Sequence, residues 1–282
     1  MKIAVASGKG GTGKTTVATN FARTVASLGD RVVYVDCDVE EPNGHIFLKP
    51  HIEETREATM FYPVVDENIC TSCGLCAKIC QYKAIMVLAD TPVVFPEMCH
   101  SCGGCTLVCP VDAITEHDRA IGTIEIGTSD GIRFIHGRLT IGEAMSPPLI
   151  RQVKKLAPDG DVVILDSPPG TSCPVIETVR DADYVLLVTE PTPFGLNDLI
   201  LAVEVVEKLR LPYGVAINRS DIGTDDTVKY CTKNHIPVVL SIPDDRRIAE
   251  AYSRGILAVE AIPEFLDRFS ALYAELKGRA AQ

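Results

Sequence analysis

A glycine-rich stretch at residues 8–16 restricts the possible folds of this chain more than any other feature of its sequence. Its order, Gly-Lys-Gly-Gly-Thr-Gly-Lys-Thr-Thr, fits the pattern G-x-x-x-x-G-K-[ST]. β-Forming residues 2–6 precede it, and apolar residues at helical spacing follow it, at Val17, Phe21, Val25 and Leu28. Strand, glycine loop and helix in this order predict a phosphate-binding loop, in which backbone N–H groups turn towards an anion at the positive end of the helix.

Individual residues of this loop have expected roles. We expect Lys14 to reach the β- and γ-phosphates of a nucleotide and the Thr15 hydroxyl to bind Mg²⁺. The alternative is a glycine-rich turn that binds nothing, and the strand and helix on either side argue against it. The predicted nucleotide-binding residues of the loop are Gly8, Lys9, Gly10, Gly11, Thr12, Gly13, Lys14, Thr15 and Thr16.

Eight of the eleven cysteines form two runs with the same spacing. The pattern C-x₂-C-x₂-C-x₃-C occurs at residues 70–80 and again at residues 99–109. Ala84-Ile85 also recurs as Ala113-Ile114, at the same offset of 29 residues. A repeat on this scale predicts a duplicated supersecondary unit with pseudo-twofold symmetry.

Cysteines at this spacing are typical ligands of four-iron clusters, with the fourth cysteine of each run binding the other cluster. The runs resemble those of bacterial two-cluster ferredoxins, although Cys80 is followed by Gln81 where a proline is usual. Zinc is the alternative, but it prefers C-x₂-C pairs separated by longer loops; disulfides are disfavoured in a reducing compartment. The predicted ligand sets are Cys70, Cys73, Cys76 and Cys109 for one [4Fe-4S] cluster, and Cys99, Cys102, Cys105 and Cys80 for the other.

Alternating strands and helices lie on both sides of the cysteine-rich region. Strands are expected at residues 31–35, 124–126, 133–135, 162–165, 184–188, 214–217 and 238–242, and helices at residues 196–209, 224–234, 246–254 and 263–277. This order predicts an α/β fold with a doubly wound, mostly parallel sheet, formed by residues 1–62 and 117–282. Residues 63–116 are expected to be an inserted, small α+β domain of the ferredoxin type.

Carboxylates follow two of the predicted strands. Asp36 and Asp38 end the second strand, and Asp166 ends the strand at residues 162–165. The carboxyl ends of parallel strands face the crevice where an α/β sheet binds its ligand. We therefore expect Asp166 to hold Mg²⁺ through water and Gly170 to be a flexible point in the loop after it. Taken singly, these aspartates could instead be ordinary strand ends or helix caps.

An early lysine in the glycine loop, Lys9, and the D-x-D pattern of Asp36 and Asp38 make the chain resemble the deviant-Walker ATPases, the class of MinD, ParA, Mrp and the nitrogenase iron protein. The resemblance implies an ATP-sandwiched dimer in which Lys9 contacts the partner's nucleotide; without it, Lys9 reads as a solvated loop residue. It also implies that Asp38 orients or deprotonates the attacking water, with Asp36 in support. The predicted catalytic residues are Lys9, Lys14, Asp38 and Asp166.

The same resemblance assigns the base of the nucleotide to residues after two later strands. It implies that Asn218 reads the adenine edge and that Pro243 packs beside the base, although Asn218 could instead be a turn residue. ATP is favoured over GTP, because the guanine motif N-K-x-D is absent. Cys173 lies at the offset from Asp166 of a cluster cysteine in the nitrogenase iron protein, but we expect it to be a free thiol.

Charge and hydropathy limit the partners and the location. The net charge of −11 argues against a nucleic-acid partner and leaves room for a protein with a basic face. No stretch reaches the roughly 20 apolar residues of a membrane helix, and no signal-peptide pattern is present, so we expect a cytoplasmic protein without membrane insertion. Acidic residues in the C-terminal helix, such as Glu264 and Asp267, disfavour binding to a membrane surface.

Nearly the whole chain resembles MinD-superfamily ATPases with an inserted ferredoxin domain. The resemblance implies ATP or ADP, Mg²⁺ and two [4Fe-4S] clusters, in an enzyme that couples ATP binding and hydrolysis to electron transfer. An ATP-gated scaffold or carrier for iron–sulfur or metallocofactor assembly is one alternative, and a redox-sensing positioning switch like MinD or ParA is another. The implied partners are a second copy or a similar ATPase, joined in a nucleotide-dependent dimer, and a redox or metallocluster protein.

Overall fold

The computed structural model describes residues 1–280, which divide into two compact units. Residues Met1–Arg56, Ile124–Arg138 and 150–280 form the first, here called the sheet unit. Residues Glu57–Thr123 and Leu139–Leu149 form the second, called the cysteine unit. The cysteine unit therefore contains the predicted insertion at residues 63–116, but begins earlier, ends later and includes a second segment.

Within residues 1–280, nine strands form one sheet in the order β11-β10-β9-β1-β8-β2-β7-β6-β3. All neighbouring pairs from β11 to β7 are parallel, which confirms the predicted mostly parallel α/β sheet. The strands are β1 (Lys2–Ala6), β2 (Val32–Asp36), β3 (His51–Val65), β6 (Ile114–Ser129), β7 (Ile132–Leu139), β8 (Val162–Asp166), β9 (Tyr184–Thr189), β10 (Tyr213–Asn218) and β11 (Val238–Ile242).

Two strands are much longer than the sequence predicts. The short strands expected at residues 124–126 and 133–135 are parts of β6 and β7, which meet at a two-residue turn. Asp130 and Gly131 form that turn with φ of 43° and 81°, the left-handed conformation that suits a tight hairpin. Strand β3 was not predicted, because charged residues interrupt its first half and it is recognisable only as a partner of β6 at the sheet edge.

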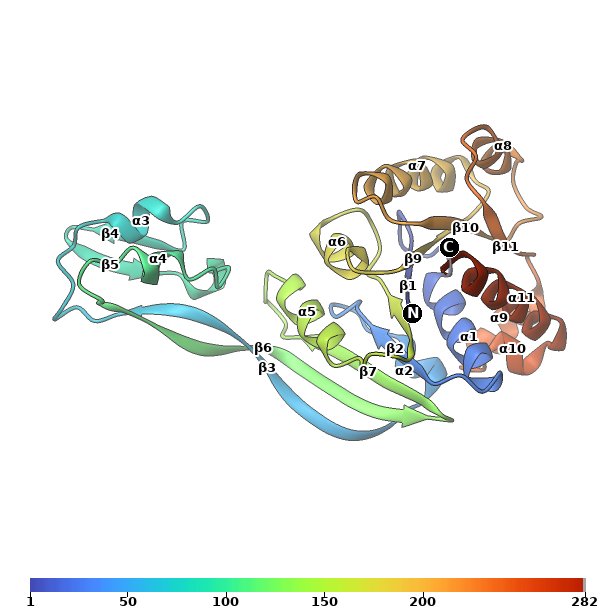
Figure 1. Ribbon diagram of the computed structural model, residues 1–282, viewed down its shortest axis with the longest axis horizontal. Helices are drawn as coiled ribbons and strands as arrows, with labels where there is room; N and C mark the ends of the chain where they lie inside the picture. The colour runs from blue at the N-terminus through green and yellow to red at the C-terminus, as the bar shows by residue number, and fades with distance from the viewer. Residues whose placement is uncertain (281–282) are drawn as a thin grey trace. The chain divides into compact units, whose positions relative to one another are not determined.

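Helices cover both faces of the parallel strands (Figure 1). Helices α1 and α11 pack together, with the Phe21 ring 6.0 Å from the Tyr273 ring, while α7 and α8 lie on the opposite side of β9 and β10. No helix within residues 1–280 is long and apolar enough to cross a membrane. The helices are α1 (Lys14–Ser27), α2 (Gly44–Leu48), α5 (Pro147–Lys155), α6 (Cys173–Val179), α7 (Pro193–Lys208), α8 (Asp226–Lys233), α9 (Arg246–Ser253), α10 (Ala258–Ala261) and α11 (Pro263–Ala280).

The cysteine unit repeats its backbone conformation at the 29-residue interval of its sequence. Positive φ angles occur in pairs, at Ser72 and Ser101 (56° and 50°) and at Gly74 and Gly103 (73° and 70°). Ser72 and Gly74 precede the short helix α3 (Leu75–Ile79), and Ser101 and Gly103 precede the short helix α4 (Gly104–Leu107). An antiparallel hairpin of β4 (Ile85–Leu88) and β5 (Thr91–Val94) and a 3₁₀ turn at Pro96–Met98 complete the repeat.

The two halves of the cysteine unit are joined by reciprocal hydrogen bonds. The amide of Phe95 donates to the carbonyl of Ala84, and the amide of Asp66 donates to the carbonyl of Ala113, both at 2.8 Å. The Ser72 hydroxyl donates to a carbonyl in the second half, and the equivalent Ser101 hydroxyl donates to one in the first. The duplicated unit with pseudo-twofold symmetry is therefore present in the backbone.

Candidate functional site

The glycine loop connects β1 to α1 and depends on close backbone approach. Gly13 has a φ of 89°, and a Cβ added there would lie 2.4 Å from Nδ2 of Asn218. A Cβ on Gly8 would lie 2.1 Å from the carbonyl oxygen of Asp198 in α7. Only glycine fits at these two positions, so the loop is fixed by contacts from β10 and α7 rather than by its own sequence alone.

Lys14 forms a buried ion pair with Asp166 at the centre of the sheet. Its Nζ atom lies 2.8 Å from Oδ1 of Asp166 and 3.5 Å from the Thr15 hydroxyl oxygen. Asp166 is completely buried and Lys14 is 8% exposed. Burial is the largest single effect and lowers the pKa of Lys14, but the charge of Asp166 and its hydrogen bond, together with the charges of Asp36 and Asp38, raise that pKa overall. The structure thus brings together the lysine and the aspartate that the sequence places on either side of a Mg-nucleotide.

Asp36 anchors the segment that follows β2. Its carboxylate accepts hydrogen bonds from the backbone amides of Asp38 (3.1 Å), Asn43 (3.1 Å) and Gly44 (2.9 Å). The side chain is completely buried, and burial followed by the charge of Asp166 raises its pKa to about 7. Asp36 therefore holds the loop that carries Asp38 against the sheet.

Asp38 itself is half-buried beside this group of charges. Burial is the main cause that raises the pKa of Asp38 to about 6, and the nearby Lys14 opposes the rise. A carboxyl group that titrates this close to neutral pH can accept a proton in a reaction. The loop after Asp166 also reaches the site, because the amide of Gly170 donates to the carbonyl of Ser7 at 2.9 Å.

A cavity of about 340 Å³ opens beside the glycine loop. It is lined by Gly11 and Gly13 of the loop, by Asn218 at the end of β10 and by Pro243 after β11. Nδ2 of Asn218 donates to the carbonyl of Thr12 at 2.9 Å, which ties the loop to β10. Part of the glycine loop and the two residues predicted to contact the base thus border one space of a size common for ligand pockets, whereas Lys14 and Thr15 are not among the residues that line it. The contacts of all these residues with a nucleotide stay a prediction.

The remaining loop residues surround the start of α1. Gly10 and Gly11 are exposed, and Lys9, Thr15 and Thr16 are half-buried. Thr12 is buried, and its hydroxyl has no hydrogen-bond partner among the atoms that the structure describes.

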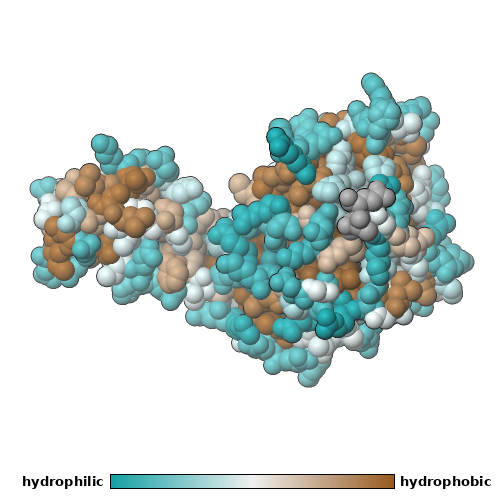
Figure 2. Space-filling model, viewed as in Figure 1, coloured by the Kyte–Doolittle hydropathy of each residue, from teal (hydrophilic) through white to brown (hydrophobic). Residues whose placement is uncertain are grey.

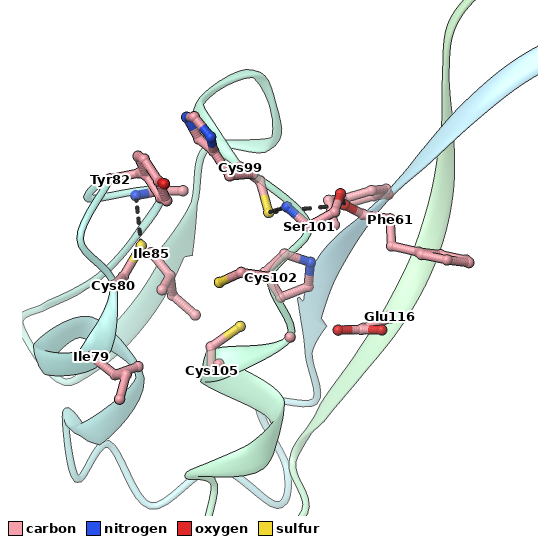
Figure 3. Close-up of a pocket in the computed structure, with 16 residues that line it drawn as sticks. Phe61, Ile79, Cys80, Tyr82, Ile85, Cys99, Ser101, Cys102, Cys105 and Glu116 are labelled. Atoms are coloured by element: carbon pink, nitrogen blue, oxygen red, sulfur yellow. Dashed lines mark hydrogen bonds between the residues drawn. The ribbon is translucent and has the colours of Figure 1, made fainter. Parts of the chain in front are cut away.

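Each set of four predicted cysteine ligands lines its own cavity in the cysteine unit. Figure 3 shows the sulfur atoms of one set facing a common space next to Ile85. In both cavities three cysteines come from one run and the fourth comes from the other. The first cavity is lined by Cys80, Cys99, Cys102 and Cys105, and the second by Cys70, Cys73, Cys76 and Cys109.

Backbone amides point at sulfur atoms at matching positions of the repeat. The amides of Ser72 and Ser101 each lie 3.4 Å from the sulfur two residues earlier, that of Cys70 or of Cys99. The amides of Ala84 and Ala113 lie 3.3 and 3.2 Å from the fourth sulfur of each run. Among residues 1–280, no group of three or more His, Cys, Asp and Glu side chains is arranged to hold a single metal ion.

The three cysteines outside the runs lie in the sheet unit. Cys37 and Cys231 are buried, and burial raises the pKa of both thiols, which is typical of packing residues. Cys173 is exposed at the first turn of α6.

Exposed apolar side chains are frequent around the two cysteine cavities. Leu107 is 86% exposed on α4, and Leu75, Ile79 and Tyr82 are each more than two-fifths exposed. Figure 2 shows apolar side chains gathered on the visible face of this unit. Apolar surface of this kind commonly marks a site of protein interaction.

One residue beside the predicted nucleotide site is not among those that the sequence pattern indicates. Tyr34 of β2 is completely buried and donates a hydrogen bond to Oδ2 of Asp166 at 2.7 Å. In the run Val-Val-Tyr-Val a tyrosine reads as one more strand residue, and its partner is 132 positions away. A polar hydroxyl in a fully buried strand was the one signal that could have identified it.

The chain is similar to known proteins along most of its length. The family model of the CobQ/CobB/MinD/ParA nucleotide binding domain matches residues 3–259. An uncharacterized protein of Methanocaldococcus jannaschii is 33% identical over 281 residues, which cover 98% of this chain and 96% of that protein. The iron-sulfur cluster carrier protein of Pyrococcus horikoshii is 25% identical, over a match that covers 98% of this chain and 88% of that protein.

A solved structure supports the fold independently. The septum site-determining protein MinD of Pyrococcus horikoshii, in complex with Mg-ADP, matches with a TM-score of 0.62 at 20% identity. The match covers 98% of this chain and 95% of that one. At this identity the likeness shows the fold and nothing further.

Proposed function

This chain belongs to the CobQ/CobB/MinD/ParA family of P-loop ATPases, and from that premise we propose that it couples ATP binding and hydrolysis to electron transfer through two [4Fe-4S] clusters. One observation carries the proposal beyond the family: each of two cavities in the cysteine unit is lined by four cysteines, three from one run and one from the other. Four thiols per cavity is the complete ligand number of such a cluster.

The nucleotide site supplies the groups that phosphoryl transfer requires. Lys14 neutralises phosphate charge, and Thr15 and Asp166 hold Mg²⁺, the latter through water. Asp38 orients the attacking water and accepts its proton, which suits a carboxyl group whose pKa is raised to about 6 by burial. Lys14 is paired with Asp166 in this structure, so its ammonium group moves from Asp166 to the phosphates when a nucleotide binds.

The donor set of the cysteine unit fits iron–sulfur clusters. Soft thiolate ligands select such clusters, and the four backbone amides that point at sulfur atoms stabilise the negative charge they carry. In a four-iron cluster each thiolate binds a different iron atom, so its ligands stand farther apart than those of a single ion. When bound, the clusters supply one-electron transfer at low potential.

We propose two partners. The first is a second copy or a similar ATPase, with the half-buried Lys9 reaching the nucleotide of the other subunit. The second is a redox protein that covers the exposed apolar side chains of the cysteine unit, among them Leu107. Electron transfer at such a surface needs only a transient contact.

A carrier function is the second candidate, because one relative is named an iron-sulfur cluster carrier protein. The two candidates differ in what leaves the protein: electrons in the first case and the cluster itself in the second. Incubation of loaded protein with a cluster-free ferredoxin and ATP separates them. In this experiment the clusters are first reduced with dithionite and the excess reductant is removed. Retention of all iron, together with electron transfer from the reduced clusters to an added oxidised ferredoxin, supports the first candidate, and ATP-dependent loss of iron to the acceptor supports the carrier.

Iron content tests the cluster assignment. Anaerobically purified protein should contain about eight iron and eight sulfide per chain. Cys109→Ala should lower the iron content. Cys173→Ala, a change at an exposed cysteine outside both sets, should keep the wild-type iron content. Zinc in place of iron, or equal iron in both variants, would end this assignment. Mg-dependent ATP hydrolysis that persists in Asp166→Asn would likewise reject the proposed nucleotide site.

A further inference from the structure

The two carboxylate oxygens of Asp166 have different partners, Tyr34 and Lys14. The Tyr34 hydroxyl donates to Oδ2 at 2.7 Å, whereas Nζ of Lys14 lies 2.8 Å from Oδ1. All three side chains lie inside the sheet unit, with Tyr34 and Asp166 completely buried. Each oxygen of this carboxylate therefore has one partner. Under the proposed function, nucleotide binding removes Lys14 from Oδ1 and leaves Tyr34 on Oδ2.

The tyrosine ring is fixed from both sides. It stacks on Phe134 with ring centroids 5.7 Å apart and an angle of 12° between the planes. On the hydroxyl side it lies over Gly44, where an added Cβ would be 2.4 Å from the hydroxyl oxygen. The amide of Gly44 in turn donates to Asp36, so the hydroxyl also touches the segment that carries Asp38.

We propose that Tyr34 is a positioning residue for Asp166, which holds Oδ2 so that Oδ1 alone faces the Mg²⁺-bound water once Lys14 has moved to the phosphates. The inference rests on the proposed role of Asp166 at Mg²⁺. A carboxylate with both oxygens released can rotate and lose its alignment, whereas one held by a rigid donor keeps it. Burial raises the pKa of Tyr34 well above its ordinary value, so the phenol keeps its proton and can donate at neutral pH.

The same sheet offers a matched control. Tyr184 of β9 is also buried, and its hydroxyl also lies over a glycine, since a Cβ on Gly214 would be 2.4 Å away. That hydroxyl, however, has no hydrogen-bond partner within the described part of the chain. Tyr34→Phe and Tyr184→Phe therefore remove the same atom from similar surroundings, and only the first removes a contact with Asp166.

The test is the affinity for ADP, measured by calorimetry with and without Mg²⁺. In Tyr34→Phe we expect the gain in affinity that Mg²⁺ provides to fall about tenfold, the effect of losing one hydrogen bond to a charged group. Affinity for ADP without Mg²⁺ should stay within about twofold of the wild type. A tyrosine that merely supports the fold would weaken both affinities equally, and that result, or an unchanged Mg²⁺ gain, overturns the proposal.

Two further variants complete the design. Tyr184→Phe should keep both affinities, and Gly44→Ala, which displaces the Tyr34 hydroxyl but keeps the ring, should reproduce the loss in Tyr34→Phe. An unchanged Mg²⁺ gain in Gly44→Ala counts against the proposal even if Tyr34→Phe does not fold. Asp166→Asn distinguishes the role of Asp166 at Mg²⁺ from the positioning role of Tyr34. If Asp166→Asn keeps the gain in affinity from Mg²⁺, the proposed Mg²⁺ site is wrong. If Asp166→Asn loses that gain while Tyr34→Phe and Gly44→Ala keep it, only the role of Tyr34 is wrong.

Discussion

Replacing Lys14 with alanine leaves the carboxylate of Asp166 buried without its positive partner. The two charged atoms are 2.8 Å apart, Asp166 is completely buried and Lys14 is 8% exposed. Removing one partner of a buried pair costs about 3–5 kcal/mol, because the other charge stays uncompensated. The hydrogen bond from Tyr34 to Asp166 remains, so we expect the lower end, about 3 kcal/mol.

Urea unfolding without nucleotide measures this cost. With a slope of about 1–3 kcal/mol per molar, the midpoint of Lys14→Ala should fall by roughly 1–3 M, followed by far-ultraviolet circular dichroism. The double variant Lys14→Ala/Asp166→Asn should recover part of the loss, because it removes the unpaired charge as well. Recovery of this kind is the signature of a direct interaction in a double-mutant cycle.

A pair with the same chemistry but no burial is the control. Nζ of Lys229 on α8 lies 2.7 Å from Oδ1 of Asp225, the residue before that helix, with side chains 67% and 69% exposed. Solvent screens such a pair, so Lys229→Ala should leave the midpoint unchanged. If Lys14→Ala unfolds at the same urea concentration as Lys229→Ala, burial does not strengthen the pair and our account of the resting site is wrong.

Three further outcomes follow from buried groups and close contacts. Burial raises the pKa of Asp36 to about 7, so its contribution to stability is fully present below about pH 4 and is lost as the pH rises through 7. The free energy of unfolding should therefore fall by up to about 3 kcal/mol from pH 5 to pH 7.5, and an equal fall in Asp36→Asn would contradict this. Gly8→Ala places a Cβ 2.1 Å from a backbone oxygen of α7 and should lower the urea midpoint, whereas Gly10→Ala, with nothing within 4 Å, should not. Arg119→Gln leaves Glu143, which is 5% exposed, without its charged partner, and should make the cysteine unit more sensitive to limited proteolysis; an unchanged digestion rate would show that the pair is not important there.

The sequence predicts those parts of the site that depend on local order. The glycine loop, the helix after it and the aspartates at the ends of β2 and β8 follow from short patterns, since a strand end and a loop are adjacent in the chain. The spacing of the cysteines names two sets of four, and the structure gathers each set around one cavity.

Contacts between distant segments could not be predicted. Tyr34 reaches Asp166 across 132 positions, and Gly8 meets Asp198 of α7, so neither requirement is written in its own neighbourhood. Strand β3 carries charged residues and depends on β6, which follows more than 40 residues later. Helix α6 has only seven residues, too few to show a helical repeat of apolar positions in a single sequence.

The exchange of the fourth cysteine between the runs has a consequence for how this unit is assembled. Each half contributes three thiols to one cavity and Cys80 or Cys109 to the other, and each donates a backbone amide, that of Asp66 or Phe95, to the opposite half. Such an arrangement corresponds to a domain-swapped dimer whose two copies have been joined into one chain. A single half, made as a separate peptide, would have a vacant corner in its own cavity and a surplus thiol outside it, and it could fill both only by pairing with a second copy of itself.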